Sequence, residues 1–336
     1  MHVLPATVHN RGGGAPNVGY GWMFGMLLLL PSNAEADGFA IQHNGSGVAA
    51  VKRADYTHAL LGTPLIDDEQ VQRLAGEVEK RVYEKPINAT IDDSGRIVPE
   101  RTGWRLDRQA FVTRFYERYY AQDGAPLEAP RLAVHANVDS ELLAFIRVRQ
   151  IGYYVTYFNS NNSNRFHNIK LAAKAINNYV VMPGETFSFN RVVGVRTVGK
   201  GYKRAPVIVR GEFSEGIGGG ICQISSTLFN AADRAGLEIV ERYSHSRRVP
   251  YVPEGRDATV NWGGPDFRFA NRYNQPILIR AAALPGQLVV TLFSSDVINY
   301  KPRHVPSASK LLPEEIDLDV DVQAQREHRQ SLQRRP

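Results

Sequence analysis

Cysteine is almost absent from the sequence, which contains one, Cys222, among 336 residues. A single thiol cannot close an intramolecular disulfide, and it cannot supply the paired cysteines of a structural zinc or iron–sulfur site. The sequence also lacks internal repeats and the motifs of nucleotide-binding loops, zinc peptidases and serine hydrolases. Disulfide-stapled folds and cysteine-rich metalloproteins are therefore excluded, and we expect neither a metal nor a cofactor.

Charge of one sign is not concentrated anywhere in the chain. Forty basic residues against 34 acidic ones give a net charge of +6, which is spread along the sequence without a basic block. This dispersed charge, without a recognisable binding motif, argues against nucleic acid as a partner but permits another anionic one. With 43% hydrophobic residues, the chain has enough apolar material for one large core or two smaller ones.

Long hydrophobic runs are also missing. The apolar stretch at residues 18–30 is too short to span a bilayer comfortably. It is followed by Ala34-Glu35-Ala36, which fits the small-x-small pattern that signal peptidases cleave. We predict a signal peptide over residues 1–36 and an exported protein of the cell wall, the periplasm or the extracellular space. The alternative is a disordered leader with an accidental apolar patch.

The N-terminal half mixes helices with short strands. Apolar residues recur at helical spacing over residues 67–83 and again from Leu106 to Tyr119, and residues 86–98 are typical of a short hairpin. The second helix carries an aromatic stripe, which we expect to pack in the core rather than to line a groove. A strand at 132–138 and a helix at 142–146 complete this half.

A polar run of asparagine and serine at residues 159–164 is typical of a boundary between domains. Beyond it we expect a helix at 169–180, and strands at 186–189, 206–210, 258–262, 267–270, 277–283 and 288–295. We therefore predict an α+β protein of two domains: an N-terminal mixed α/β module at 37–158 and a C-terminal, mainly β domain with two helices at 159–300. Residues 301–336 become polar and basic, and we expect a mobile tail there.

The single cysteine stands where a glycine run enters a helix. Gly218, Gly219 and Gly220 precede Ile221, which begins the apolar stripe, and Cys222 lies about 100° around from that stripe. The partial positive charge of a helix N-terminus favours thiolate over thiol. The backbone N–H groups of Gly220, Ile221 or Cys222 can hold the oxyanion that forms when a thiolate attacks a carbonyl. A free thiol in an exported protein is open to oxidation, which favours a nucleophile over a buried structural cysteine.

A cysteine nucleophile needs a base. His245 is the first candidate because it follows the cysteine helix closely enough for the chain to return, and His167 is the second; the alternative for His245 is a solvent-facing position. Asp257 and Asp266 could each orient the base or merely cap a turn. We expect a catalytic set of Cys222, His245 and Asp257. The candidates for oxyanion or substrate binding are Gly219, Gly220, Ile221, Gln223, Ser226 and Asp266.

The residues from about 165 to 283 resemble the VanW family, which is named for a protein associated with vancomycin resistance. The matching motifs are Pro183-Gly184-Glu185-Thr186-Phe187-Ser188-Phe189-Asn190, Gly201-Tyr202, residues 218–231, His245-Ser246 and residues 255–260. A second, partial resemblance, carried by residues 95–99 and 103–107, links residues 85–120 to a proposed peptidoglycan-binding domain that often precedes VanW domains.

The resemblance implies a role at the cell wall, because some members of the family are L,D-transpeptidases that use the motif cysteine, here Cys222. In that chemistry the thiolate attacks the carbonyl of meso-diaminopimelate or an equivalent residue in a tetrapeptide stem, and D-alanine leaves. An amine of a neighbouring stem then resolves the thioester. Peptidoglycan stem peptides are thus the expected partner. The alternatives are a cysteine amidase or endopeptidase, which passes the acyl group to water, and a non-catalytic wall-binding module.

Overall fold

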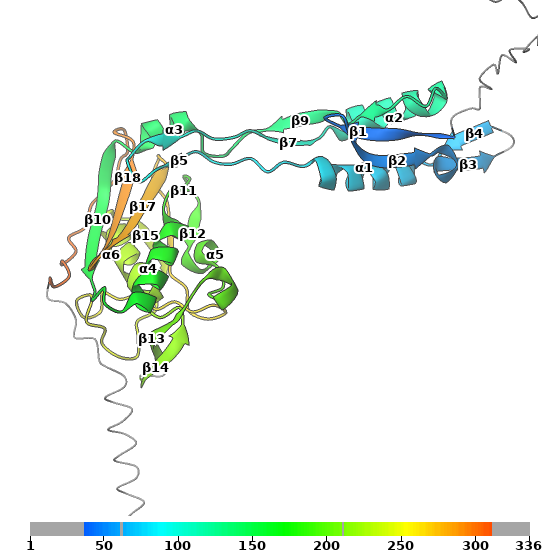
Figure 1. Ribbon diagram of the computed structural model, residues 1–336. Helices are drawn as coiled ribbons and strands as arrows, with labels where there is room; N and C mark the ends of the chain where they lie inside the picture. The colour runs from blue at the N-terminus through cyan, green and yellow to red at the C-terminus, as the bar shows by residue number, and fades with distance from the viewer. Residues whose placement is uncertain (1–36, 61–62, 210–211, 311–336) are drawn as a thin grey trace, which may run out of the picture. The chain divides into compact units, whose positions relative to one another are not determined.

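The computed structural model describes residues 37–60, 63–209 and 212–310, so the predicted signal segment lies outside the described residues. The chain divides into two units (Figure 1). Residues up to 81 with 106–130 form unit 1, and residues 82–105 with those from 131 onward form unit 2. Helices and antiparallel strands are combined in both, which confirms the α+β prediction. Within the described ranges, no helix has the length and apolar content needed to cross a membrane.

Unit 1 combines two helices with short strands. Its elements are β1 (Gly38–His43), β2 (Ser46–Lys52), η1 (Arg53–Tyr56), β3 (Thr57–Leu60), β4 (Thr63–Ile66), α1 (Asp68–Val82), α2 (Arg108–Ala121) and β8 (Leu127–Glu128). Asn44 and Gly45 join β1 to β2 with positive φ angles of 50° and 73°, as a two-residue hairpin turn requires. The aromatic stripe of α2 packs inward as expected: Phe111 and Phe115 are fully buried, and Phe115 meets Phe39 edge-on with ring centroids 5.4 Å apart.

The main sheet of unit 2 has the order β10-β18-β17-β11 and is antiparallel throughout. Its strands are β10 (Arg149–Tyr157), β11 (Tyr179–Val181), β17 (Ile277–Leu284) and β18 (Gln287–Ser294). α6 (Ile221–Arg234) packs against β10 and β18, and α4 (Ser163–Ile176) packs against β17 and against α6. Gly152 lets β10 approach α6 closely, because a Cβ there would lie 2.4 Å from the carbonyl oxygen of Ala231.

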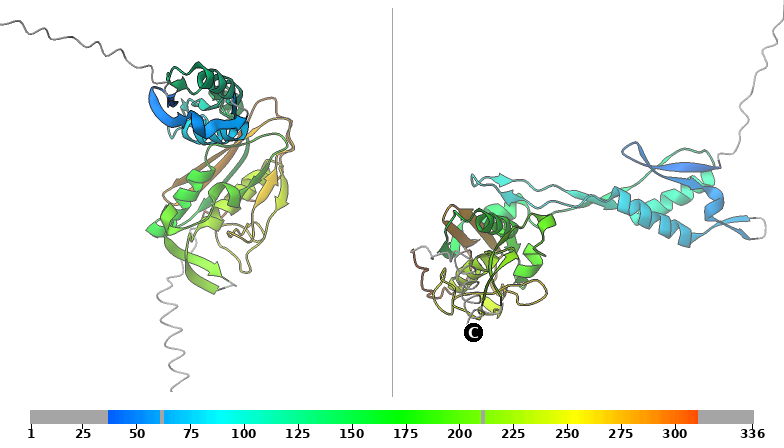
Figure 2. Two further views of the ribbon diagram at one scale, coloured as in Figure 1. Left: turned by 90° about the vertical axis from the view of Figure 1, so that its right-hand side faces the viewer. Right: turned by 60° about the horizontal axis from the view of Figure 1, so that its bottom comes forward.

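The remaining described elements of unit 2 are strands and short helices. They are β5 (Thr90–Ile91), β6 (Ile97–Val98), β7 (Gly103–Leu106), β9 (Arg131–Val134), α3 (Ser140–Ile146), β12 (Thr186–Ser188), α5 (Phe189–Val193), η2 (Val198–Lys200), β13 (Arg204–Val209), β14 (Glu212–Ile217), β15 (Glu238–Glu241) and β16 (Arg268–Ala270). β12, β16 and β15 form a second antiparallel sheet, in which Phe187 stacks on Phe269 at 5.0 Å. β13 and β14 form a hairpin that extends beyond the end of α4 (Figures 1 and 2).

The division between the units differs from the predicted boundary at residue 159. β10 precedes that residue and yet pairs with β18 along its whole length, so it belongs to unit 2. The polar run does not separate two bodies. It leads into α4, where the side chain of Asn162 accepts a hydrogen bond from the backbone N–H of Arg165 at 3.0 Å. Periodicity also missed the short helix α5, which accompanies the two predicted helices, α4 and α6, among the described residues of the C-terminal region.

Two further expectations are corrected. The predicted strand at 258–262 has no strand partner, and its backbone groups bond instead to α6 and to neighbouring loops. The start of the predicted mobile tail packs onto unit 2, where Val305 is buried and its carbonyl accepts from Arg234 Nη2 at 2.6 Å. The hydroxyl of Tyr154 donates to the carbonyl of Pro306 at 2.8 Å. Residues 311–336 lie outside the described residues.

Candidate active site

Glycines shape the approach to the cysteine helix. Gly218 and Gly220 have φ angles of 87° and 98°, in the left-handed region that favours glycine. A Cβ on Gly219 would lie 2.5 Å from the carbonyl oxygens of both Ala205 and Pro206 in β13. The run therefore turns the chain out of β14 and lays it against β13, which fixes where α6 begins.

Cys222 lies in the first turn of α6 and is half-buried. Its thiol donates a weak hydrogen bond to the carbonyl oxygen of Val260 at 3.7 Å. Val260 belongs to the irregular segment at 258–261, so this segment forms one side of the thiol's surroundings. The placement matches the requirements for a nucleophile at a helix N-terminus: a sulfur that is held in place and still partly accessible.

His245 and Asp257 form a buried pair beside the cysteine. Oδ2 of Asp257 accepts from Nδ1 and from the backbone N–H of His245, at 2.6 Å in each case, and both side chains are 8% exposed. Burial lowers the pKa of His245, but hydrogen bonds to Asp257 and to Cys222 outweigh this and bring the pKa to about 9 instead of 6.5. Burial raises the pKa of Asp257, but its bonds from His245 hold the value below the usual range. Because Nδ1 faces Asp257, Nε2 is the ring nitrogen left for the sulfur.

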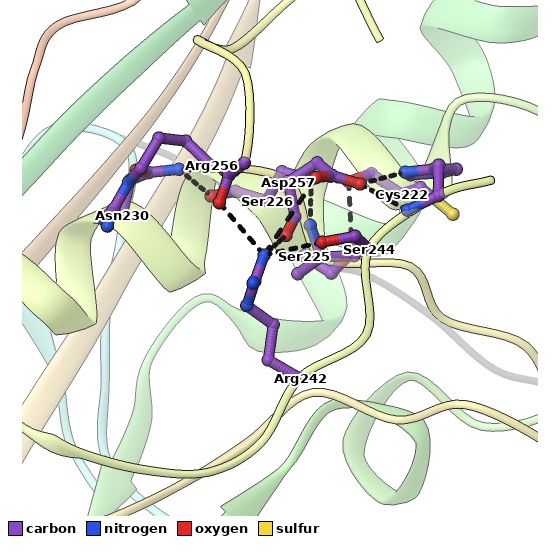
Figure 3. A network of polar contacts seen from close by, with 11 residues as sticks. Cys222, Ser225, Ser226, Asn230, Arg242, Ser244, Arg256 and Asp257 are labelled. Atoms are coloured by element: carbon purple, nitrogen blue, oxygen red, sulfur yellow. Dashed lines mark hydrogen bonds and ion pairs between the residues drawn. The ribbon is translucent and has the colours of Figure 1, made fainter. Parts of the chain in front are cut away.

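Residues 256–258, which include Asp257, are hydrogen-bonded to polar side chains of α6 (Figure 3). Ser225 Oγ donates to the carbonyl of Ala258 at 2.6 Å, and Ser226 Oγ accepts from the N–H of Ala258 at 2.9 Å. Asn230 and Arg256 bond reciprocally: Asn230 Nδ2 donates to the Arg256 carbonyl at 2.7 Å, and Arg256 Nε donates to Asn230 Oδ1 at 2.8 Å. These bonds fix the position of Asp257 relative to α6, the helix that carries Cys222.

Arg242 connects Ser244, which precedes His245, with Asp257 (Figure 3). Its Nη1 donates to the carbonyl of Asp257 at 2.6 Å and to Ser244 Oγ at 3.1 Å. The guanidinium groups of Arg242 and Arg256 both lie over the ring of Phe229 on α6, at 5.0 and 4.6 Å from its centroid. The loop bearing His245 and the loop bearing Asp257 are therefore cross-linked to each other and to α6.

Several of the predicted binding residues have hydrogen-bond partners within the protein. The N–H of Ile221 donates to the Gly218 carbonyl at 3.3 Å, and the side chain of Ile221 is buried in the core. Gln223 is fully buried and bridges α6 to β10 and α4, because its Nε2 donates to Thr156 Oγ1 at 2.9 Å and its Oε1 accepts from Arg165 Nη2 at 2.6 Å. Ser226 is fully buried in the contact with Ala258 described above.

The second acid and the second base lie apart from this pair. Asp266 accepts from Ser188 Oγ at 2.6 Å and from the N–H of Asn190 at 2.8 Å, so it holds the start of α5 rather than a histidine. His167 Nε2 is 2.8 Å from the carbonyl oxygen of Gly201. Of the candidate bases and acids, the structure brings His245 and Asp257 to Cys222.

Two residues near the thiol, Tyr251 and Arg196, were not predicted from the sequence. Burial raises the pKa of Tyr251 well above its usual range, and the charge of Cys222 adds to this, while a hydrogen bond to Ser226 opposes it. Arg196 also interacts electrostatically with Cys222. Both reach the site from loops distant in sequence, so no spacing pattern could have found them. Within the described ranges, no three histidine, cysteine, aspartate or glutamate side chains gather as a metal site would require.

Comparison with known proteins identifies the family. Residues 164–293 match the family model described as VanW like protein. The chain is 55% identical over 295 residues to the uncharacterized protein YoaR of Bacillus subtilis (strain 168). The aligned residues cover 88% of this chain and 97% of that protein. The chain belongs to the VanW family. It is also 36% identical over 115 residues to the vancomycin B-type resistance protein VanW of Enterococcus faecalis (strain ATCC 700802 / V583), covering 32% of this chain and 41% of that protein. No solved structure matches it.

The VanW match contains every member of the candidate site. Cys222, His245, Asp257 and Arg196 all fall within residues 164–293. The family resemblance noted in the sequence is thereby confirmed, and the motifs that carried it acquire structural reasons. The 218–231 motif forms the glycine turn and α6, and the 255–260 motif is the segment that α6 holds in place.

Proposed function

We propose that this VanW-family protein is exported and modifies the cell wall, as a cysteine L,D-transpeptidase that acts on peptidoglycan stem peptides. The observation that carries the proposal is the placement of Cys222 at the N-terminus of α6 beside His245, whose Nδ1 is hydrogen-bonded to Asp257. A relative named for vancomycin resistance supports a role at the wall. No metal or cofactor is required by the reaction described below.

The first half-reaction forms a thioester. With a pKa of about 9, His245 is protonated at neutral pH, and an imidazolium beside Cys222 stabilises the thiolate. The sulfur attacks the carbonyl carbon of the third stem residue, so an S–C bond forms and the carbonyl electrons move to oxygen. Collapse of this tetrahedral intermediate breaks the C–N bond, and Nε2 of His245 gives its proton to the amine of the departing D-alanine.

The second half-reaction transfers the acyl group. The amine of a neighbouring stem attacks the thioester, and the now neutral Nε2 of His245 takes a proton from that amine. Collapse breaks the S–C bond and regenerates the thiolate with its imidazolium partner. Asp257 keeps Nδ1 protonated and fixes the ring plane throughout, so that Nε2 faces the reacting atoms in both steps.

The oxyanion of both intermediates needs a backbone donor. The first four N–H groups of a helix have no carbonyl four residues earlier to receive them, and they carry the positive end of the helix dipole. The N–H of Ile221 is already directed to Gly218. We assign the oxyanion to the N–H of Cys222, which lies in the same turn.

Incubation of the full chain with disaccharide tetrapeptides tests the proposal. We expect free D-alanine and cross-linked dimers by mass spectrometry, a thioester adduct on Cys222, and loss of all three in Cys222→Ala. Shortened stems without dimers would instead indicate an amidase or endopeptidase. Absence of any product, with retained binding to sacculi, would indicate a non-catalytic wall-binding module.

A further inference from the structure

Arg196 lies beside the proposed active site but has no part in the steps derived above. Its Nη2 donates to Asn190 Oδ1 at 2.8 Å, and its guanidinium lies over the ring of Phe189 at 5.8 Å from the centroid. A Cβ on Gly218 would lie 3.2 Å from the Cβ of Arg196. The stem of Arg196 therefore packs on the glycine run that leads into Cys222, and its orientation is fixed from two sides.

One nitrogen of this guanidinium, Nη1, is not used within the protein as described. Nη1 is shielded from solvent and finds no acceptor among the described residues. Asp266 is the acidic residue whose charge Arg196 feels, but its oxygens already accept from Ser188, from the N–H of Asn190 and from the N–H of Phe267. A buried donor on a charged group is costly to leave without a partner. The arrangement calls for an anionic acceptor.

The position of Arg196 limits which anion that can be. Its side-chain stem packs on Gly218, in the glycine run that leads into Cys222, and its charge acts on the Cys222 sulfur, so the guanidinium lies near the point where the substrate is attacked. In a stem that ends in D-alanine, the terminal carboxylate is separated from the attacked carbonyl carbon only by the amide nitrogen and one Cα. It is therefore the substrate carboxylate that must lie closest to the sulfur.

We propose that Arg196 binds the free terminal carboxylate of the donor peptide, so that the site accepts stems that end one residue beyond the attacked carbonyl. This proposal rests on the proposed function and names the group by which that site selects its donor. A charge-assisted hydrogen bond from Nη1 to the carboxylate completes the guanidinium's partners and holds the scissile amide in place over the thiolate. After the C–N bond breaks, the same carboxylate leaves with the amino acid.

Alkylation of Cys222 tests carboxylate binding without any need for turnover. Iodoacetate and iodoacetamide both form an S–C bond and release iodide, and they differ in a carboxylate against a neutral amide. Because the chain has one cysteine, the labelled mass reports this site alone. Relative to free cysteine, we expect the wild-type chain to favour iodoacetate about tenfold more than Arg196→Gln does. Arg196→Lys should be intermediate.

Arg191→Gln is the matched control, since it removes the same charge from an exposed arginine of α5 that pairs with Glu185 at 3.5 Å. The control should keep the wild-type ratio. An iodoacetate preference in Arg196→Gln equal to that of the wild type would overturn the proposal. So would a wild-type ratio no higher than that of free cysteine, a comparison that needs no variant to fold.

A tetrapeptide and its C-terminal amide provide the second test. For the wild type we expect kcat/KM to fall at least about tenfold on amidation, and for Arg196→Gln we expect the two substrates to be used equally. A purely structural role would lower both rates together and keep their ratio. Turnover of both substrates at equal rates by the wild type would refute the Arg196 assignment and leave the transpeptidase standing. A charge-dependent alkylation ratio without turnover of either peptide would refute the transpeptidase activity and leave carboxylate binding by Arg196 standing.

Discussion

The two units differ in where they place their polar side chains. In unit 1, ion pairs lie at the surface, as in Arg73–Glu69, whose side chains are 65% and 84% exposed. In unit 2, the polar groups around α6 are buried: Asn230 and Ser226 have no exposed surface, and Asp257 is 8% exposed at its side chain. Unit 1 resembles an ordinary small fold with an aromatic core and a charged exterior.

The difference shows what the buried polar groups of unit 2 are for. Exposed ion pairs contribute little to stability because water and salt screen them. A buried network costs desolvation and must be nearly complete to be tolerated, but it then holds its members in one geometry. In unit 2 that geometry sets His245 against Cys222. We therefore read the network as the support of a reactive site, and the following predictions test that contrast between the units.

Loss of the base should have the largest effect. His245→Ala removes the group that protonates the leaving amine and deprotonates the acceptor, so the rate of cross-linking should fall by roughly 10²–10⁴. His167→Ala is the control, because His167 contacts the carbonyl of Gly201 and lies apart from the pair. The rate of dimer formation from tetrapeptide stems measures both. Near-normal turnover in His245→Ala would show that the buried pair serves only the fold.

The glycine before the N-cap of α6 should be sensitive to a change as small as one methyl group. Gly219→Ala places a Cβ within 2.5 Å of two backbone carbonyls of β13, which cannot yield as a side chain could. We expect the free energy of unfolding to fall by about 3 kcal/mol, measured by urea denaturation followed by circular dichroism. Gly45→Ala, in the open hairpin turn of unit 1, has no atom within 4 Å and should cost about 1 kcal/mol through its positive φ alone. Equal losses would contradict the packing role of Gly219.

The parts of this site that can be predicted from the sequence are those whose signals lie next to each other in the chain. Cys222 could be found because a glycine run and a helical stripe stand next to each other in the sequence. Arg196 could not, because its approach to the thiol depends on how α5 and the glycine run pack together. The segment at 258–262 failed for a more specific reason: Ala258 and Val260 are buried and Thr259 is not, as in a strand, but the Ala258 backbone bonds to the serines of α6. An alternating pattern of apolar residues indicates which side chains are buried, but it does not show which groups the backbone bonds to.

The stability of unit 2 should depend on pH through His245. Its pKa in the folded protein is about 9, against an ordinary 6.5, so the folded chain binds more protons than the unfolded chain between these values. The stabilisation is present in full below pH 6.5 and is lost as the pH rises through 9, at most roughly 3 kcal/mol. Urea midpoints between pH 6 and 10, read from Trp104 and Trp262 fluorescence, should show this fall in the wild type and much less of it in His245→Asn. His58→Asn, at a 60% exposed histidine of unit 1, should leave the wild-type profile unchanged.

The smallest effect should come from the exposed pair of unit 1. Arg73→Ala breaks the contact with Glu69 at the surface of α1, where solvent already competes for both charges, and should change the free energy of unfolding by less than about 0.5 kcal/mol. In unit 2, Asn230→Ala removes the partner of the Arg256 carbonyl and of Arg256 Nε, and should cost about 2 kcal/mol by the same urea measurement. A cost for Arg73→Ala as large as that for Asn230→Ala would mean that surface charge also organises unit 1. The buried network could then no longer be read as a mark of the site, because both units would depend on polar contacts to the same degree.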